Sequence, residues 1–251
     1  MLISGRTQAQ EKRYQSAKIS RIAARYNGVI AREINRAMND AASKLGKPMA
    51  EDQVRHKHIE NMTGILIRLW TDAGNSSVSG AFKIAKSFLQ MEFKKDITTP
   101  IVDAAIADWI KAFAPKRITE ITATTGKDIR RIVANAREEG LSERDTARLI
   151  NEVAPSKSAS RAQTIARTEA HGSSQGISLA VANETDIPMK KVWLTNVSDR
   201  TREEHIDVNG QSVALNEMFD VGGEALEYPG DPSGSAENTI NCRCVIGYEI
   251  A

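Results

Sequence analysis

Hydrophobic residues recur at helical spacing through most of the first 155 positions of this chain. In residues 7–40 they stand three or four positions apart, which places them on one stripe of a single long helix. The stripe consists of Ile19, Ile22, Tyr26, Ile30, Ile34 and Ala37. The same spacing predicts further helices over residues 51–71, 78–95, 100–115, 127–139 and 142–155.

Glycine, proline and β-branched residues mark the expected breaks between these helices. The run Gly74-Asn75-Ser76-Ser77 predicts one helix end, and Pro115 and Pro155 predict two others. Residues 117–125 are rich in isoleucine and threonine, which favour strands. We therefore expect this segment to be an irregular connector or a brief strand.

The pattern changes after Pro155. We expect a helix over residues 158–181, a strand over 190–195, a short helix from Ser198 to His205, a hairpin of 206–208 with 211–213, a loop over 222–235 and a final strand over 244–248. The hairpin rests on Asn209-Gly210, a strong signal for a two-residue turn. The sequence thus predicts an α+β protein with a mostly helical region over residues 1–155 and a small α+β domain over 156–251.

Composition excludes several classes of protein. The formal net charge is +2 and the sequence pI is about 8.5, so any contact with nucleic acid should be local. The two cysteines, Cys242 and Cys244, are separated by one residue, which disfavours a disulfide between them. The first residues have no apolar run typical of a signal peptide, and no segment has the length of a membrane span. We therefore expect an intracellular protein that does not bind membranes.

Basic residues fill much of the first helix outside its apolar stripe, among them Arg21, Arg25 and Arg32. The simplest interpretation is a solvated face. The alternative is a surface that binds DNA phosphates or an acidic partner, with a partner also covering the apolar stripe. His56 and His58 are two positions apart on the second predicted helix. They cannot share a metal ion there, so we treat them as incidental.

Soft metal ligands and nucleophiles are concentrated near the C-terminus. His205, Cys242 and Cys244 could supply three ligands to a metal ion, whereas a structural zinc site needs four. The same residues could form a Cys-His nucleophilic pair, which would need an orienting carboxylate such as Asp199. A third alternative is a hydrogen-bonded polar cluster with no metal and no catalysis.

The order of several short motifs carries a resemblance to a known family. The chain has Ala-Arg-Thr-Glu at residues 166–169, Asp-Arg at 199–200, Asn-Gly at 209–210, Pro-Gly-Asp-Pro-Ser-Gly at 229–234 and Asn-Cys-Arg-Cys at 241–244. In this order they resemble the Mu F-like phage head morphogenesis family of minor capsid proteins. The resemblance covers roughly residues 158–248.

This resemblance implies a structural protein of a phage or prophage head. The implied partners are the portal protein, other head proteins and, non-specifically, double-stranded DNA. The implied location is the host cytoplasm during assembly and then the inside of the virion head. The alternative is an enzyme or toxin-like effector that uses a pocket around His205, Cys242 and Cys244.

A departure from the family pattern bears on the metal. Members of the family often have Cys-x-x-Cys where this chain has Arg202 to His205, and arginine is not a metal ligand. We therefore expect no catalytic residues, no cofactor and no metal. We expect instead a structural polar cluster with an ion-pair network that connects Arg167 or Glu169 to the segment 199–202. The full cluster is Arg167, Glu169, Asp199, Arg200, Arg202, His205, Asn241, Cys242 and Cys244.

Overall fold

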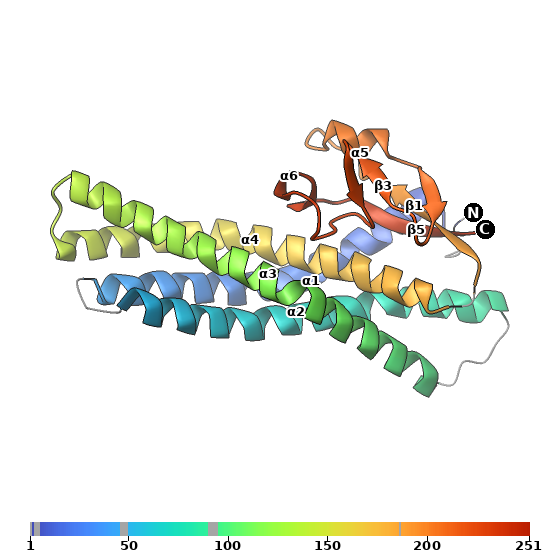
Figure 1. Cartoon of the computed structure of the whole chain (residues 1–251), viewed down its shortest axis with the longest axis horizontal. Coiled ribbons are helices and arrows are strands. Elements are labelled where there is room, and N and C mark those ends of the chain that lie inside the picture. Colours follow the sequence, from blue (N-terminus) through green and yellow to red (C-terminus); the bar gives the residue numbers. More distant parts are fainter. Residues whose placement is uncertain (1, 3–5, 46–49, 90–94, 186) are drawn as a thin grey trace. The chain divides into compact units, whose positions relative to one another are not determined.

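The computed structural model describes residue 2 and residues 6–45, 50–89, 95–185 and 187–251. Most of these residues belong to long helices: α1 (Gln8–Ser43), α2 (Ala50–Leu89), α3 (Lys95–Glu138) and α4 (Glu143–Asn183) (Figure 1). Short strands and helices follow α4 along the chain. The predicted class is confirmed: α+β, with a mostly helical first part and a small mixed C-terminal part. None of the helices described is long and apolar enough to cross a membrane.

The chain forms two compact units. The first contains residues 1–22, 70–112 and 167–251, and the second contains residues 23–69 and 113–166. Each of the four long helices therefore contributes one part to each unit. The predicted boundary between residues 155 and 156 falls inside α4. The division into two domains at that point stays a prediction.

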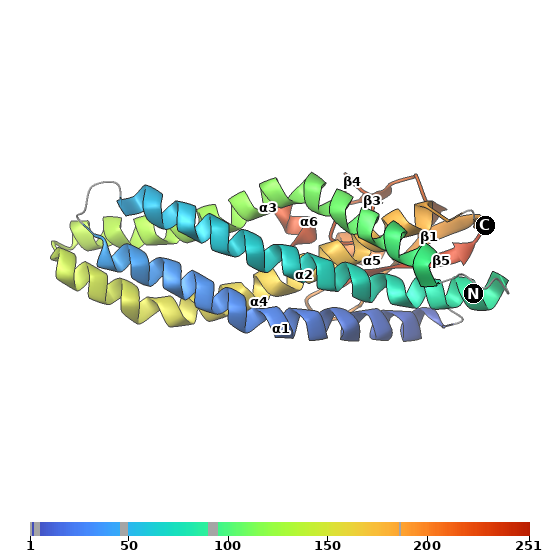
Figure 2. The ribbon, with the colours of Figure 1, turned by 90° about the horizontal axis from the view of Figure 1, so that it is seen from below.

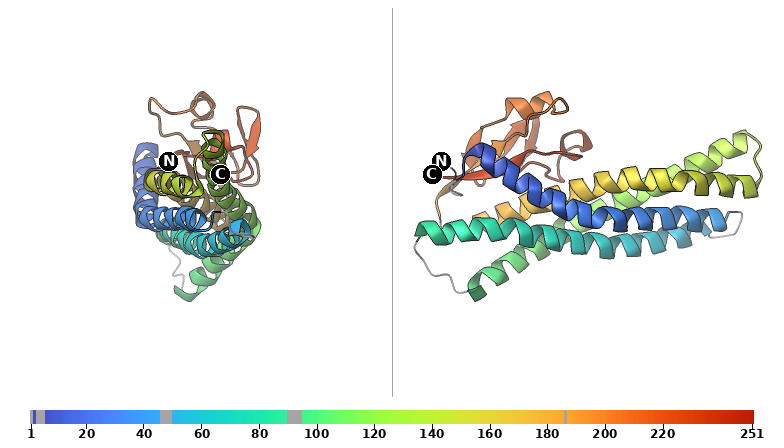
Figure 3. Two further views of the ribbon diagram at one scale, coloured as in Figure 1. Left: turned by 90° about the vertical axis from the view of Figure 1, so that its left-hand side faces the viewer. Right: turned by 180° about the vertical axis from the view of Figure 1, so that it is seen from behind.

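The second unit consists of one segment from each long helix, and these segments lie side by side (Figures 2 and 3). A polar network centred on the buried His58 connects all four of them. His58 Nδ1 lies 3.1 Å from Glu33 Oε1, and its Nε2 lies 3.3 Å from Thr125 Oγ1. Arg161 also donates to Thr125 Oγ1, at 2.8 Å. His58 is thus a hydrogen-bonded core residue, because satisfied polar groups are tolerated inside a helical bundle.

The apolar stripe predicted on the first helix is part of the protein's own core. The long helix is confirmed, and every residue of the stripe is buried. The most deeply buried are Ile30 and Ile34, each 0% exposed. The expectation that a partner covers this stripe is therefore wrong. By contrast, Arg21, Arg25 and Arg32 are exposed along the same helix.

The first unit contains every strand found in the described part of the chain. A three-stranded antiparallel sheet has the order β2 (Ser212–Ala214), β1 (Met189–Leu194), β5 (Val245–Ile250). β3 (Phe219–Val221) and β4 (Glu224–Leu226), both labelled in Figure 2, form a separate antiparallel pair. The short helices α5 (Glu203–Asp207) and α6 (Ala236–Thr239) lie between strands in sequence. The strands predicted around residues 190–195 and 244–248 are confirmed.

Two glutamines attach β5 to α1 and α4. Gln15 Nε2 donates to the Ile246 carbonyl at 2.9 Å, and the Ile246 amide donates to Gln175 Oε1 at 2.8 Å. Gln175 Nε2 then donates to Gln15 Oε1 at 3.1 Å. Because each amide uses both its donor and its acceptor, this partly buried cycle fixes the position of β5 on the helices.

Several helix ends predicted from the sequence are wrong, because the helices continue through them. α2 passes through Gly74, where an added Cβ would lie 2.7 Å from side-chain atoms of Ile106 and Ile177. The glycine therefore permits close packing rather than ending the helix. α4 likewise passes through Pro155, which is flanked by the fully buried Ala154 and the buried Ser158.

The β-branched segment 117–125 is helical, not a connector or strand, and α3 also includes Pro115. Ile118 and Ile121 are buried on one side of the helix. The hydroxyls of Thr119, Thr122 and Thr124 donate to carbonyls four residues earlier, as Thr119 does to Pro115 at 2.7 Å. Burial thus outweighs the weak preference of these residues for strands.

The turns of the C-terminal part also differ from those that the sequence predicts. Asn209-Gly210 does not form a two-residue hairpin, since α5 precedes it and β2 pairs with β1. The short helix also begins at Glu203 rather than near Ser198. The predicted loop contains the β3–β4 hairpin, which turns at Gly222 and Gly223. Their φ angles of 62° and 84° explain why glycine is needed there.

Candidate functional site

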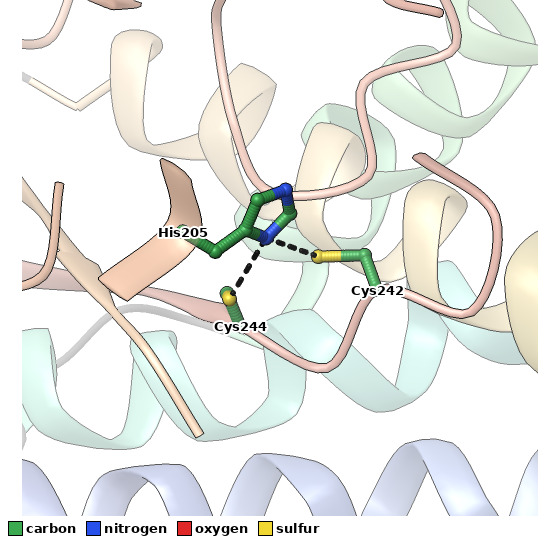
Figure 4. A group of neighbouring side chains, drawn as sticks. All are labelled: His205, Cys242 and Cys244. Atoms are coloured by element: carbon green, nitrogen blue, oxygen red, sulfur yellow. Dashed lines mark hydrogen bonds between the residues drawn. The ribbon is translucent and has the colours of Figure 1, made fainter. Parts of the chain in front are cut away.

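Three buried side chains converge in the first unit. α5 carries His205, and the segment between α6 and β5 carries Cys242 and Cys244. His205 Nδ1 lies 3.3 Å from Cys244 Sγ and 3.7 Å from Cys242 Sγ (Figure 4). All three donor atoms lie within 4.8 Å of one another, and each residue is 2% exposed. The residues singled out by chemical type therefore do meet.

The cysteine segment is shaped by its neighbours. Asn241 has a φ of 58°, in the left-handed region that asparagine tolerates better than most residues. Its amide donates to Thr168 Oγ1 at 3.1 Å, and its side chain lies 3.5 Å from Arg167 Nη1. Arg202 Nη2 donates to the Ile240 carbonyl at 2.7 Å. These contacts connect the segment to α4 and to the residue that precedes α5.

The orientation of His205 is fixed from its other side. Its Nε2 lies 3.3 Å from Asn238 Oδ1 and donates a hydrogen bond to that oxygen. The Thr195 hydroxyl donates to the His205 carbonyl. The Trp193 ring packs against the imidazole edge to face, with 5.5 Å between ring centroids. With Nε2 protonated, Nδ1 carries the lone pair that faces the two sulfur atoms.

The two cysteines titrate as a pair. A hydrogen bond from Cys242 lowers the pKa of Cys244 to about 4; burial opposes this shift, and His205 adds to it. The same hydrogen bond, together with burial, raises the pKa of Cys242 well above its usual value. The shared hydrogen bond thus shifts the pKa values of the two thiols in opposite directions.

A second histidine that sequence reasoning missed lies nearby. His171 on α4 is 2% exposed, and burial lowers its pKa to about 4, so it is neutral. Its ring is hydrogen-bonded to the backbone of Pro229, and it interacts electrostatically with Cys244 and His205. Its Nε2 has no hydrogen-bond partner among the described residues. It lies two residues after Glu169, just beyond the Ala-Arg-Thr-Glu run, and the sequence there shows no metal-ligand spacing.

The remaining residues of the predicted cluster are dispersed. Glu169 is buried, and it accepts a hydrogen bond from Trp70 Nε1 at 3.2 Å. Asp199 and Arg200 are exposed ahead of α5. Partial burial and the nearby guanidinium groups of Arg243 and Arg200 lower the pKa of Arg167. The structure thus places Arg167 near two other arginines, and the ion-pair network with the segment 199–202 stays a prediction.

Comparison with known proteins defines the class. Residues 127–247 match the family described as Phage Mu protein F like protein. These residues therefore form a Mu F-like domain, of a family related to phage heads, and the resemblance noted from the motifs is confirmed.

Two curated relatives share parts of this chain. One is the uncharacterized protein YqbB of Bacillus subtilis (strain 168), 28% identical over 55% of this chain and 47% of that protein. The other is the NAD(+)--arginine ADP-ribosyltransferase EFV of Enterococcus faecalis (strain ATCC 700802 / V583), 36% identical over 42% of this chain and 22% of that protein. The chain thus spans less than half the length of each relative. No solved structure matches it.

Proposed function

We propose that this protein is a minor head protein of a phage or prophage, which acts inside the procapsid at the portal during head morphogenesis. The observation that carries the proposal is the Mu F-like match over residues 127–247. The proposed partners are the portal protein and other head proteins. The proposed location is the host cytoplasm during assembly and then the interior of the virion.

The exposed basic face of α1 supports a contact with packaged DNA. Arg21, Arg25 and Arg32 are spaced four and seven residues apart, which places them on one side of the helix. All are exposed, and an exposed row of guanidinium groups can bind successive phosphates without reading the base sequence.

The alternative function, an enzyme or toxin-like effector, is favoured by the shared segment with the ADP-ribosyltransferase. That segment is only 22% of the transferase, however, so it does not carry the whole activity of that protein to this chain. A nucleophilic cysteine must also reach its substrate. Cys242 and Cys244 are each 2% exposed, so the geometry supports a structural role.

The proposal is tested in particles assembled from the genome that encodes this chain. A variant with Arg21, Arg25 and Arg32 changed to glutamate is compared with one in which exposed arginines on α2, α3 and α4 are reversed: Arg68, Arg137 and Arg144. Both variants carry the same net charge. Mass spectrometry should detect the wild-type protein in purified heads and show cross-links to the portal. Absence of the wild-type protein from procapsids and heads would refute the proposed role.

DNA binding is measured separately with purified protein and duplex DNA at several salt concentrations. Loss of three phosphate contacts should make the slope of log K against log salt shallower by about 3. The control variant should keep the wild-type slope, because only the total charge differs. Equal slopes for the two variants would show that the α1 face does not bind DNA.

A further inference from the structure

The arrangement around His205 Nδ1 is unusual for a metal-free cluster of thiols. Both cysteine sulfurs approach this one nitrogen, at 3.3 and 3.7 Å (Figure 4). A neutral imidazole nitrogen has one lone pair in the plane of the ring, so it accepts one good hydrogen bond. The second sulfur gains little from that lone pair, and its hydrogen bond is to the other sulfur. A single ion between the three atoms would satisfy both sulfurs and the nitrogen together.

The distances fit such an ion. Zinc binds histidine nitrogen at about 2.0–2.1 Å and cysteine sulfur at about 2.3 Å in tetrahedral sites. Tetrahedral angles then separate neighbouring nitrogen and sulfur ligands by about 3.5 Å. The two observed separations lie on either side of this value. The upper limit of 4.8 Å for all pairs of donor atoms also accommodates two sulfurs on one ion.

The surroundings of His205 have the features of an outer coordination shell. A histidine that binds a metal usually donates its other N–H to an oxygen acceptor, which sets the tautomer. Asn238 Oδ1 has this role at 3.3 Å from Nε2, and Asn238 Nδ2 is held in turn by the Val221 carbonyl at 3.4 Å. This hydrogen bond at Nε2 orients the lone pair of Nδ1 towards the two sulfur atoms in the metal-free protein.

A fourth donor is available, which the sequence alone did not reveal. Because the hydrogen bond of His171 to the backbone of Pro229 leaves Nε2 without a partner, that atom is a buried nitrogen with an unused lone pair. Buried polar atoms in folded proteins nearly always have a hydrogen-bond partner, so such an atom calls for an explanation. His171 lies outside the group of three donors and within electrostatic range of Cys244 and His205. His171 Nε2 is therefore the candidate for the fourth ligand of a four-coordinate site.

We propose that His205 Nδ1, Cys242 Sγ and Cys244 Sγ bind a zinc-class divalent ion, with His171 Nε2 as the fourth donor. Two thiolates cancel the charge of the ion, so a neutral complex is buried. Thiolate and imidazole ligands favour zinc over magnesium or calcium. The ion joins α4, α5 and the segment before β5, and so it stabilises a part of the fold whose strands β2, β3 and β4 are only three residues long. This inference is independent of the proposed function in phage heads.

The first test uses the full chain, purified under reducing conditions without chelators. Elemental analysis should find one zinc per chain after equilibration with zinc and desalting. Replacement by Co²⁺ should give the visible absorption of a tetrahedral cobalt site and a sulfur-to-cobalt charge-transfer band. Removal of the ion by a chelator should lower the thermal midpoint. The opposite result is a chain without metal, without these bands and with an unchanged midpoint, and it would establish the metal-free polar cluster expected from the sequence.

Variants then assign the ligands. Cys244→Ser and His205→Gln should abolish the cobalt spectrum, whereas His56→Gln, at an exposed histidine of the other unit, should leave it unchanged. His171→Gln should weaken metal affinity by about tenfold or more and alter the visible bands, since water replaces a ligand. If this variant binds cobalt with the wild-type spectrum, His171 is not the fourth donor. The measurements on the unmodified chain decide the proposal even if a cysteine variant does not fold.

Discussion

Trp193 anchors the core that contains the cysteines, and its replacement tests how that core is stabilised. The side chain is 0% exposed and packs edge to face on Phe219, with 5.3 Å between ring centroids. Truncation of a buried tryptophan to alanine typically costs about 3–5 kcal/mol. The indole N–H, however, has no hydrogen-bond partner among the described residues. Such an atom imposes a penalty of about 1–3 kcal/mol that the truncation removes, so we expect a net loss near 3 kcal/mol.

Trp193→Phe is the matched control, since it keeps an aromatic ring and deletes the unpaired N–H. We expect it to cost about 1 kcal/mol or less, because the relieved penalty offsets much of the smaller cavity. For a chain of this size, about 3 kcal/mol corresponds to a decrease of about 6–12 °C in the thermal midpoint. Circular dichroism and limited proteolysis measure both variants. An unchanged midpoint for Trp193→Ala, or an equally large loss for Trp193→Phe, would refute the reasoning.

Two further predictions concern the first unit. Gly74→Ala should destabilise the protein by about 1–3 kcal/mol relative to Gly64→Ala. Both variants gain the same helix propensity, but only the new methyl group at position 74 clashes with neighbouring side chains. Urea unfolding measures the difference in free energy. Burial raises the pKa of Tyr248 above the usual value of about 10, so its contribution to stability is fully present below pH 10 and is lost as pH rises further. Tyr248→Phe should therefore flatten the fall in urea midpoint between pH 9 and 11, and an unchanged slope would contradict this.

Three residues of the candidate site could be predicted from the sequence, but His171 could not. Histidine and closely spaced cysteines are rare enough in this chain to be noticed, and His205, Cys242 and Cys244 do converge. His171 carries no local signal, because it lies in a helix whose other buried residues are mostly small or apolar. Its relevance comes from the fold alone, which places α4 against the turn at Pro229. A sequence pattern reports neighbours along the chain and cannot report this contact.

The wrong predictions of helix ends share one physical cause. The free energy of burying side chains is larger than the local preference of a glycine or proline to end a helix. A glycine inside a helix costs about 1 kcal/mol relative to alanine, and a proline about 3 kcal/mol. Complete burial of one large apolar side chain contributes about 1.5–3 kcal/mol. α2 contains Leu66, Leu69 and Trp70 in the residues just before Gly74, each 0% exposed. The free energy gained by burying these side chains exceeds the helix-propensity cost of the glycine. A glycine therefore does not end a helix when the residues before and after it in that helix are buried. The same comparison explains why Gly140 does end α3: it is exposed with a φ of 71°, and the residues next to it are exposed as well.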